Sequence, residues 1–430
     1  MIEVRGLNDI KLCGRQWLLN QNNDTTKLKV KKVTAIKKGR CVRCNSLVTY
    51  KLPNGKKYCR FCIGLGRICE GDELIRSCEN VKYAKIKDGG LTWNGHLTPD
   101  QQKVADNLIE SFLKKRNHLV HAVTGAGKTE MLFQVVAKCL AQGRRCCIAT
   151  PRIDVVDELF PRLQIAFGNV EIGKYHGREY SEPKDEQLII CTTHQLLKFF
   201  RAFDLLVIDE VDSFPFRDNP VLNYGVQNAV KEDGSIFYLS ATPDEDLVND
   251  AKKKIIDYSI LNRRFHGGLL PVPQELMFTR PFLKKGKLHP KLLREIRKII
   301  VSNKPLLIFI PKILELELYQ KAIEKYFPNL KIASVHAQDS YRQEKVLAFR
   351  NNEFEILLTT TILERGVTFK HVQVIVVAAD DQIYSTPSLV QIAGRVGRSQ
   401  DDQTGKVIFC YHHYTPEIKE AKKQIRMMNK

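Results

Sequence analysis

The sequence predicts an α/β protein with two lobes, each built on a parallel sheet, and a small N-terminal zinc ribbon. Strand and helix patterns alternate in two successive series along the chain, which is typical of parallel sheets covered by helices. A glycine-rich loop lies between a strand and a helix in the first series. Two Cys-x-x-Cys pairs near the N-terminus predict the ribbon.

Composition limits the class of protein. The 430 residues are enough for two or three domains, and the 43% hydrophobic content is that of a globular chain. No stretch of 18 or more apolar residues is present, and residues 1–5 lack the apolar core of a signal peptide. We therefore expect a cytoplasmic protein, in which twelve cysteines do not indicate a disulfide framework.

Positive charge is concentrated at the N-terminus. Residues 1–95 contain 20 Lys and Arg against 8 Asp and Glu, so they contribute 12 of the 20 net positive charges. The densest run consists of Lys27, Lys29, Lys31, Lys32, Lys37, Lys38, Arg40 and Arg43. A polyanion such as nucleic acid is the natural partner of such a run. An anionic membrane surface and a merely solubilising basic face are the alternatives.

Four cysteines within this basic region have the spacing of a metal site. Cys41 and Cys44 are separated by fourteen residues from Cys59 and Cys62, and the intervening segment has a hairpin turn signal at 54–55. Four thiolates suit one tetrahedral Zn²⁺ with no open position, which favours a structural site over a catalytic one. The alternative is two redox-active pairs.

The predicted domain boundaries follow from these patterns. Residues 1–39 form a basic N-terminal extension, 40–66 the zinc ribbon and 67–92 a helical connector. The first lobe covers 93–262, a linker 263–275, and the second lobe 276–430. Cys69 and Cys78 lack knuckle spacing, so we expect them to be ordinary buried thiols.

A helix is expected to open the first lobe. Thr98 suits its cap and Pro99 its first position, and the helix continues to about residue 115. Gln101 precedes the phosphate loop, and its amide can read the edge of adenine. The alternative for Gln101 is an exposed residue at the start of a helix.

The glycine-rich loop predicts a phosphate site. A strand at 119–122 leads into it and a helix at 130–140 follows, so the loop amides lie at a helix N-terminus. Lys128 can reach the β- and γ-phosphates of ATP, and Thr129 can hold Mg²⁺. The binding residues are Thr124, Gly125, Ala126, Gly127, Lys128 and Thr129. A turn that only caps the helix is the alternative.

Paired acids follow another strand of the first lobe. Asp209 and Glu210 come directly after the apolar strand 205–208, where ligands of parallel sheets bind. We expect Asp209 to hold Mg²⁺ and Glu210 to orient and deprotonate the attacking water. The hydroxyls of 240–242 follow the next strand and can sense this acidic loop.

The second series lacks a phosphate loop and offers arginines instead. Arg395 and Arg398 are three residues apart in 391–398, which we expect to be the start of a helix with both side chains on one face. Guanidinium groups in this position can act as arginine fingers on the γ-phosphate.

Residues 93–410 resemble the two RecA-like lobes of superfamily 2 helicases, because these motifs occur in that order. More narrowly, the four-cysteine module, the Trp93-x-Gly95-x-Leu97 lead-in and the segment 209–215 resemble the ComFA family of late competence ATPases. The resemblance implies a single-stranded-DNA-stimulated ATPase that helps to move transforming DNA through the ComEC pore, with ComFC, a phosphoribosyltransferase-like protein, as a partner. Contact with the inner face of the membrane and oligomerisation stay open.

The resemblance also assigns residues. Gly366 matches the glycine that couples nucleotide to DNA, and Arg395 and Arg398 match the finger arginines. The residues that match motifs on the DNA backbone are Thr150, Pro151, Arg152, Thr192, Thr193, Thr360 and Thr361. Two positions depart from helicase relatives: Asp212 replaces the histidine of DEAH-type relatives, and Thr368 lies where many relatives have Asp.

Two other functions stay open at this point. A duplex-separating helicase similar to PriA shares the motif style, although all four knuckle cysteines here are N-terminal and no insert separates the lobes. The other is an ATP-gated DNA-binding adaptor, in which hydrolysis only times release from a partner.

Overall fold

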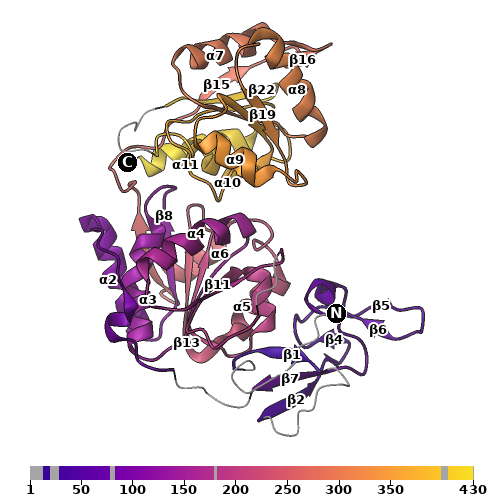
Figure 1. The fold of residues 1–430 in the computed structure, drawn as a ribbon, viewed down its shortest axis with the longest axis vertical. Helices are drawn as coiled ribbons and strands as arrows, with labels where there is room; N and C mark the ends of the chain where they lie inside the picture. Colours follow the sequence, from indigo (N-terminus) through magenta and orange to yellow (C-terminus); the bar gives the residue numbers. More distant parts are fainter. Residues whose placement is uncertain (1–12, 20–28, 78–82, 179–181, 399–404, 430) are drawn as a thin grey trace. The chain divides into compact units, whose positions relative to one another are not determined.

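The computed structural model describes residues 13–19, 29–77, 83–178, 182–398 and 405–429 (Figure 1). The chain forms two compact units. The first comprises 1–121 and 128–260, and the second comprises 261–430, with the loop 122–127 grouped with it. Lys27 and Cys78, which were named above, lie outside the described residues. Within the described residues, no helix is long and apolar enough to cross a bilayer.

A small antiparallel sheet begins the first unit. It has the order β1 (Gln16–Leu18), β7 (Glu73–Ser77) and β2 (Val30–Thr34). The basic N-terminal segment therefore pairs with a strand from beyond the ribbon. The helical expectation for 67–92 was wrong for the described part of this segment, 67–77 and 83–92, which contains β7 and the 3-10 turn η2 (Lys87–Gly90) but no α-helix.

The ribbon follows β2. Its short strands are β3 (Ile36–Lys37), β4 (Arg40–Cys41), β5 (Tyr50–Lys51) and β6 (Lys57–Tyr58), and the 3-10 helix η1 (Arg60–Leu65) carries the last cysteine. β5 and β6 pair as an antiparallel hairpin. Gly55 has φ 81° in the turn, a conformation that glycine adopts without strain, so the predicted hairpin is confirmed.

The first lobe is built on a sheet of seven strands in the order β10-β11-β9-β12-β13-β8-β14. The strands are β8 (His118–Ala122), β9 (Cys146–Thr150), β10 (Ile172–Tyr175), β11 (Leu188–Thr192), β12 (Phe203–Asp209), β13 (Val230–Ser240) and β14 (Asp257–Leu261). Neighbouring strands from β10 to β8 pair in parallel. The carboxyl ends of these strands therefore share one edge.

Helices connect these strands: α2 (Pro99–Leu113), α3 (Lys128–Ala141), α4 (Ile153–Ala166), η3 (Thr193–Lys198), α5 (Pro220–Ala229) and α6 (Glu245–Lys252). The predicted start of α2 is confirmed, because the Thr98 side chain accepts from the backbone N–H of Gln101 and Pro99 is the first helical residue.

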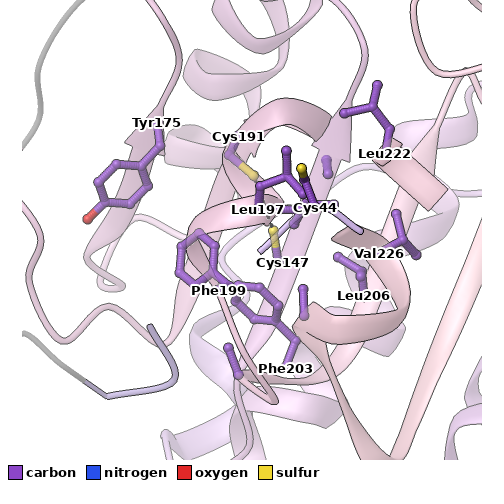
Figure 2. Close-up of a cluster of buried hydrophobic side chains, with 14 of the residues drawn as sticks. Cys44, Cys147, Tyr175, Cys191, Leu197, Phe199, Phe203, Leu206, Leu222 and Val226 are labelled. Atoms are coloured by element: carbon purple, nitrogen blue, oxygen red, sulfur yellow. Dashed lines mark hydrogen bonds between the residues drawn. The ribbon is translucent and has the colours of Figure 1, made fainter. Parts of the chain in front are cut away.

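One core joins the ribbon to the first lobe. Figure 2 shows Cys44 close to Leu197 and Leu222 in a buried cluster that also contains the other three ribbon cysteines. These cysteines are at most 1% exposed. A ribbon of this size buries little apolar surface alone, so packing against η3 and α5 adds to its stability.

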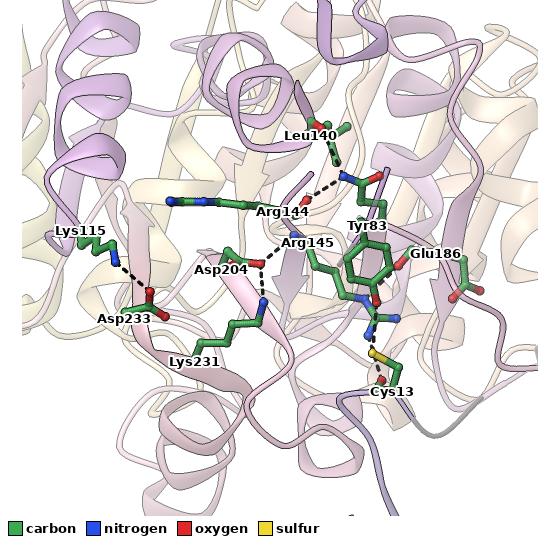
Figure 3. Close-up of polar contacts among 11 residues, drawn as sticks. Cys13, Tyr83, Lys115, Leu140, Arg144, Arg145, Glu186, Asp204, Lys231 and Asp233 are labelled. Atoms are coloured by element: carbon green, nitrogen blue, oxygen red, sulfur yellow. Dashed lines mark hydrogen bonds and ion pairs between the residues drawn. The ribbon is translucent and has the colours of Figure 1, made fainter. Parts of the chain in front are cut away.

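Buried polar contacts also tie the N-terminal segment to this lobe (Figure 3). Arg145 is 1% exposed; its Nε donates to the Glu186 carbonyl at 2.9 Å and its Nη1 to the Cys13 carbonyl at 3.0 Å. Arg15 is also buried and donates to the Tyr175 hydroxyl at 3.1 Å. Because loss of a buried charged donor leaves carbonyls unsatisfied, these contacts hold the two parts in one arrangement.

The second unit contains another parallel sheet, in the order β15-β22-β21-β18-β20-β19. Its strands are β15 (Gln274–Met277), β18 (Leu306–Phe309), β19 (Ile332–Val335), β20 (Ile356–Thr359), β21 (Gln373–Val376) and β22 (Val407–Tyr411), beside the small hairpin β16 (Leu283–Lys284) and β17 (Lys287–Leu288). The helices are α7 (Pro290–Val301), α8 (Ile313–Tyr326), α9 (Arg342–Arg350), η4 (Thr361–Leu363), α10 (Thr386–Ala393) and α11 (Pro416–Met428). The expected class of two parallel-sheet lobes is confirmed.

Candidate functional site: a nucleotide site and a four-cysteine centre

The glycine-rich loop connects a strand end to a helix start. β8 ends at Ala122 and α3 begins at Lys128. Gly125 has φ 81° and Gly127 has φ 74°, conformations that side chains disfavour and that are typical of loops whose amides bind an anion. Thr129 is buried in the first turn of α3. The donor set of amides, an ammonium and a hydroxyl fits ATP with Mg²⁺.

The acidic pair lies on the same sheet as this loop. Asp209 ends β12, which is separated from β8 only by β13. Burial of its carboxyl group raises the pKa of Asp209 to about 6, and the charge of Lys128 opposes this shift. The loop lysine and the strand-end carboxylate thus act on each other, as one nucleotide site requires.

Glu210 is held by an unusual backbone conformation. Its φ is 55°, and its amide donates to Asp209 Oδ1 at 2.9 Å. A non-glycine residue in the left-handed region costs free energy, and such residues cluster at functional sites. The turn directs the Glu210 side chain away from the path that a continued strand would give it.

Asp212 connects the acidic loop to the end of β13. Ser240 Oγ donates to Asp212 Oδ1 at 2.8 Å, and Thr242 Oγ1 donates to Asp212 Oδ2 at 2.7 Å. The hydroxyls of 240–242 therefore contact the acidic loop, as the sequence indicated. The Asp212 carboxylate accepts both hydroxyls, one at each oxygen.

Gln101 is buried rather than exposed at the start of α2. Only 4% of it is exposed, and its Oε1 accepts from the Thr98 amide at 2.9 Å. The amide oxygen therefore closes the N-terminus of the helix. Its role in reading adenine stays a prediction.

Most residues that match the DNA-contacting motifs are buried. Thr150 and Thr193 are both 0% exposed, and in the described part of the chain neither hydroxyl has a hydrogen-bond partner. Thr192, Thr360 and Pro151 are buried as well, whereas Arg152 and Thr361 are half-buried. Arg152 and Thr361 are therefore the most exposed residues of this set.

The finger candidates lie in a turn after a helix. α10 ends at Ala393, so Arg395 and Arg398 follow the helix, and the expected helix start at this point was wrong. The helix had already begun at a Ser385 cap followed by Pro387. The two side chains do not share one face: Arg395 is 1% exposed and donates to the Glu364 carbonyl at 3.0 Å, whereas Arg398 is half-buried.

Arg398 contacts Thr368. Its Nη1 donates to Thr368 Oγ1 at 3.3 Å, and its Nε donates to the Gly394 carbonyl at 2.9 Å. Gly366, with φ 76°, lies in the same loop as Thr368. A neutral hydroxyl restrains Arg398 less than a carboxylate would, because charge-assisted bonds are the stronger ones.

Sequence reasoning missed Arg264. This linker residue is 2% exposed, and its guanidinium donates to the carbonyls of Val396 at 2.7 Å, Gly397, and Gly394 at 3.1 Å. Burial, with the charge of Arg398, lowers the pKa of Arg264 to about 9, so it stays charged at neutral pH. It holds the turn that carries the finger candidates, and only long-range packing reveals this.

The four cysteines converge on one centre. Their sulfur atoms all lie within 4.8 Å of one another, with 3.8 Å between Cys41 and Cys62 and 3.4 Å between Cys44 and Cys59. A tetrahedral zinc with Zn–S bonds of about 2.3 Å requires sulfurs about 3.8 Å apart, so the set fits Zn²⁺. None of the described cysteines forms a disulfide.

Arg43 supports this centre. It lies between the first two cysteines and is 2% exposed, and its Nε donates to Cys62 Sγ at 3.3 Å. Its Nη1 donates to the Leu65 carbonyl at 3.1 Å. The guanidinium would offset the excess negative charge of four thiolates around one Zn²⁺. Sequence reasoning counted Arg43 only as part of the basic run.

Comparisons with family models agree with the two lobes. Residues 94–245 match the model described as type III restriction enzyme, res subunit, and residues 290–400 match the helicase conserved C-terminal domain. Dbp5 of S. cerevisiae bound to RNA and ADP BeF3 shares the fold with TM-score 0.56 and 18% identity, covering 80% of this chain and 93% of that one. Lhr of Mycobacterium smegmatis bound to ssDNA and AMP-PNP shares the fold with TM-score 0.59 and 15% identity, covering 78% of this chain and 50% of that one.

Curated relatives extend the likeness over the whole chain. Competence protein ComFA of Streptococcus pneumoniae is 43% identical over 97% of this chain and 97% of its own length. Competence protein ComFA of Bacillus subtilis is 39% identical over 91% of this chain and 85% of its own length. The transcription-repair-coupling factor of Staphylococcus aureus is 25% identical over 70% of this chain and 26% of its length. With its helicase domains and this identity, the chain belongs to the ComFA family of superfamily 2 helicase-like ATPases.

Proposed function

We propose that this ATPase moves along single-stranded DNA and so helps to draw transforming DNA into the cytoplasm. The observation that carries the proposal is the position of Lys128, after the loop that follows β8, and of Asp209, at the end of β12, at one edge of one sheet, in a chain that belongs to a competence family. A site of this kind can favour one conformation of the protein when ATP is bound and another after ATP is hydrolysed.

The residues of the site have distinct roles in this proposal. Lys128 neutralises the phosphates, and Thr129 with Asp209 would hold Mg²⁺, which spreads the negative charge of the β- and γ-phosphates. Glu210 orients the attacking water and accepts its proton. Gln101 recognises adenine. Of the two finger candidates, Arg398 is the more accessible, whereas Arg395 is anchored at the Glu364 carbonyl.

The partners of this ATPase are a nucleic acid and other proteins of DNA uptake. Two solved relatives in fold hold RNA or ssDNA together with a nucleotide analogue, which supports a nucleic-acid substrate here. Arg152 and Thr361 would contact its backbone, supported by the buried threonines named above, while Gly366 couples the two sites. By family resemblance, ComEC supplies the pore and a ComFC-like protein is a partner, with contact at the membrane face and oligomerisation as further parts of the assembly.

Displacement of streptavidin from a biotinylated single strand tests translocation. We expect ATP-dependent displacement by the full chain and none by Glu210→Gln. ATP hydrolysis stimulated by DNA without displacement would favour the ATP-gated adaptor. Separation of a forked duplex under the same conditions would instead favour the PriA-like helicase.

A further inference from the structure

A basic groove lies where the N-terminal sheet meets the first lobe. It has a volume of about 830 Å³ and is bordered by β2, β3, the end of β7 and the loop between η3 and β12. Six of its described lining residues are cationic and none is acidic. The cations are Lys31, Lys32, Lys37, Lys38, Arg76 and Arg201.

The groove is separate from the nucleotide site. Arg201 precedes the first residue of β12, whereas Asp209 is the last residue of the same strand. A strand rises about 3.3 Å per residue, so the groove lies about 20 Å from the acidic pair, at the opposite edge of the sheet. The motif residues at the carboxyl ends of the strands therefore do not line it.

The cations are positioned despite mutual repulsion. Lys31 lies directly opposite Arg76 in the antiparallel pair of β2 and β7, and like charges in such a position destabilise a sheet. The Arg76 guanidinium lies 3.8 Å from the centre of the Phe200 ring and donates to Gln16 Oε1 at 2.9 Å and 3.1 Å. Gln16 is 1% exposed and donates to the Leu197 carbonyl. These contacts fix Arg76 to the first lobe.

The lysines are exposed and available to an anion. Lys31, Lys32, Lys37 and Lys38 are exposed, and none forms an ion pair with another described residue. Arg201 does pair with Glu232, at 2.5 Å, and Glu232 does not line the groove. The groove thus keeps an excess of positive charge, because none of its described lining residues is acidic.

We infer that this groove binds the phosphate backbone of a single-stranded nucleic acid, at a second site that guides the strand before or after it crosses the motif-lined edge. A groove of cations beside an aromatic ring is typical of single-strand binding. Protein interfaces are depleted in lysine, so four lysines disfavour a protein partner. The inference rests on the function proposed above, because that function supplies the single strand.

Charge neutralisation in the full chain tests the groove. The triple variant Lys31→Gln, Lys37→Gln, Lys38→Gln removes three exposed charges without opening the core. The matched control, Lys51→Gln, Lys56→Gln, Lys57→Gln, removes the same charge from the exposed ribbon hairpin. Binding of labelled oligo(dT) is measured at several salt concentrations. We expect the groove variant to lose at least about tenfold in affinity and its log–log salt slope to fall by about 2, at about 0.7 per phosphate contact, and the control to change little.

The outcomes are distinguishable. If the wild-type chain binds oligo(dT) and the groove variant loses no more affinity than the control variant does, the groove inference is wrong and the proposed function stands. If the wild-type chain binds no oligo(dT), both fail. Polyglutamate serves as a second probe: loss of polyglutamate binding with unchanged oligo(dT) binding would overturn the inference in favour of an acidic protein partner.

Discussion

At the scale of single residues, Arg264 carries the most specific expectation. Its fork reaches three carbonyls of the turn 394–397, and a lysine ammonium cannot reproduce that geometry. Arg264→Lys should therefore lower kcat of ATP hydrolysis by about tenfold or more, with a smaller change in KM, because it displaces groups that act in the transition state.

Arg263→Lys is the matched control, since Arg263 is the exposed neighbour of Arg264. It should leave both constants near the wild-type values. An Arg264→Lys enzyme with an unchanged kcat, or with equal losses in affinity and rate, would show that Arg264 does not position the turn.

His118 gives a dependence of stability on pH. It is 1% exposed; its Nδ1 lies 2.8 Å from Ser111 Oγ and its Nε2 lies 2.9 Å from Ser259 Oγ. Burial lowers the pKa of His118 to about 4. Because the Ser111 hydroxyl donates to Asp257, the neutral ring donates from Nδ1 and accepts at Nε2. In the unfolded chain His118 binds a proton near pH 6.5. The contribution of the neutral His118 ring to the free energy of unfolding is therefore complete above that pH and decreases as the pH falls toward 4.

The loss amounts to about 3 kcal/mol between pH 7 and pH 4. Urea unfolding of the wild type and His118→Gln across this range measures it. The variant should be less stable at pH 7, and the difference should shrink as the pH falls. Parallel curves for the two proteins would mean that His118 does not contribute to the pH dependence.

At the scale of elements, the zinc ribbon makes the clearest prediction. Purified protein should contain one Zn²⁺ per chain, and Cys59→Ser should lose it, because four thiolates are needed to close the site. Residues 29–77 should then become sensitive to protease. Basal ATP hydrolysis should persist, although the first lobe should lose some stability, since the cysteines share its core.

Cys69→Ser is the control, because Cys69 is half-buried and lies outside the four-cysteine cluster. It should keep its zinc. Metal analysis that finds no zinc in the wild type, or full zinc in Cys59→Ser, would contradict the structural site.

The elements also show what local sequence can predict. The Thr98 cap and the hairpin turn at Gly55 depend on chemistry within a few residues, and both were predicted. β7 was not, because two apolar residues cannot decide between helix and strand, and β7 depends on pairing with β1 and β2. The position of Arg395 after α10 was also missed, since a cap at Ser385 moves the whole helix earlier.

At the scale of the whole molecule, the sequence indicated two lobes, a phosphate loop and an acidic pair because each motif has a local signature. It did not indicate that the ribbon packs on the first lobe, nor that Arg43 and Arg264 are buried supports. A buried arginine looks like a surface arginine in sequence, and only contacts between distant segments separate the two. The sequence likewise showed that the N-terminus is basic, but only the sheet of β1, β7 and β2 shows that several of these cations line one groove.

The most direct test of the account is the rate of ATP hydrolysis by the full chain without cofactor and with single-stranded DNA, duplex DNA or RNA, compared with Glu210→Gln. We predict stimulation by single-stranded DNA above the other cofactors, and a loss of about 10²-fold or more in Glu210→Gln, because the base for the attacking water is removed. A rate that is indifferent to single-stranded DNA, or normal turnover in Glu210→Gln, would contradict it.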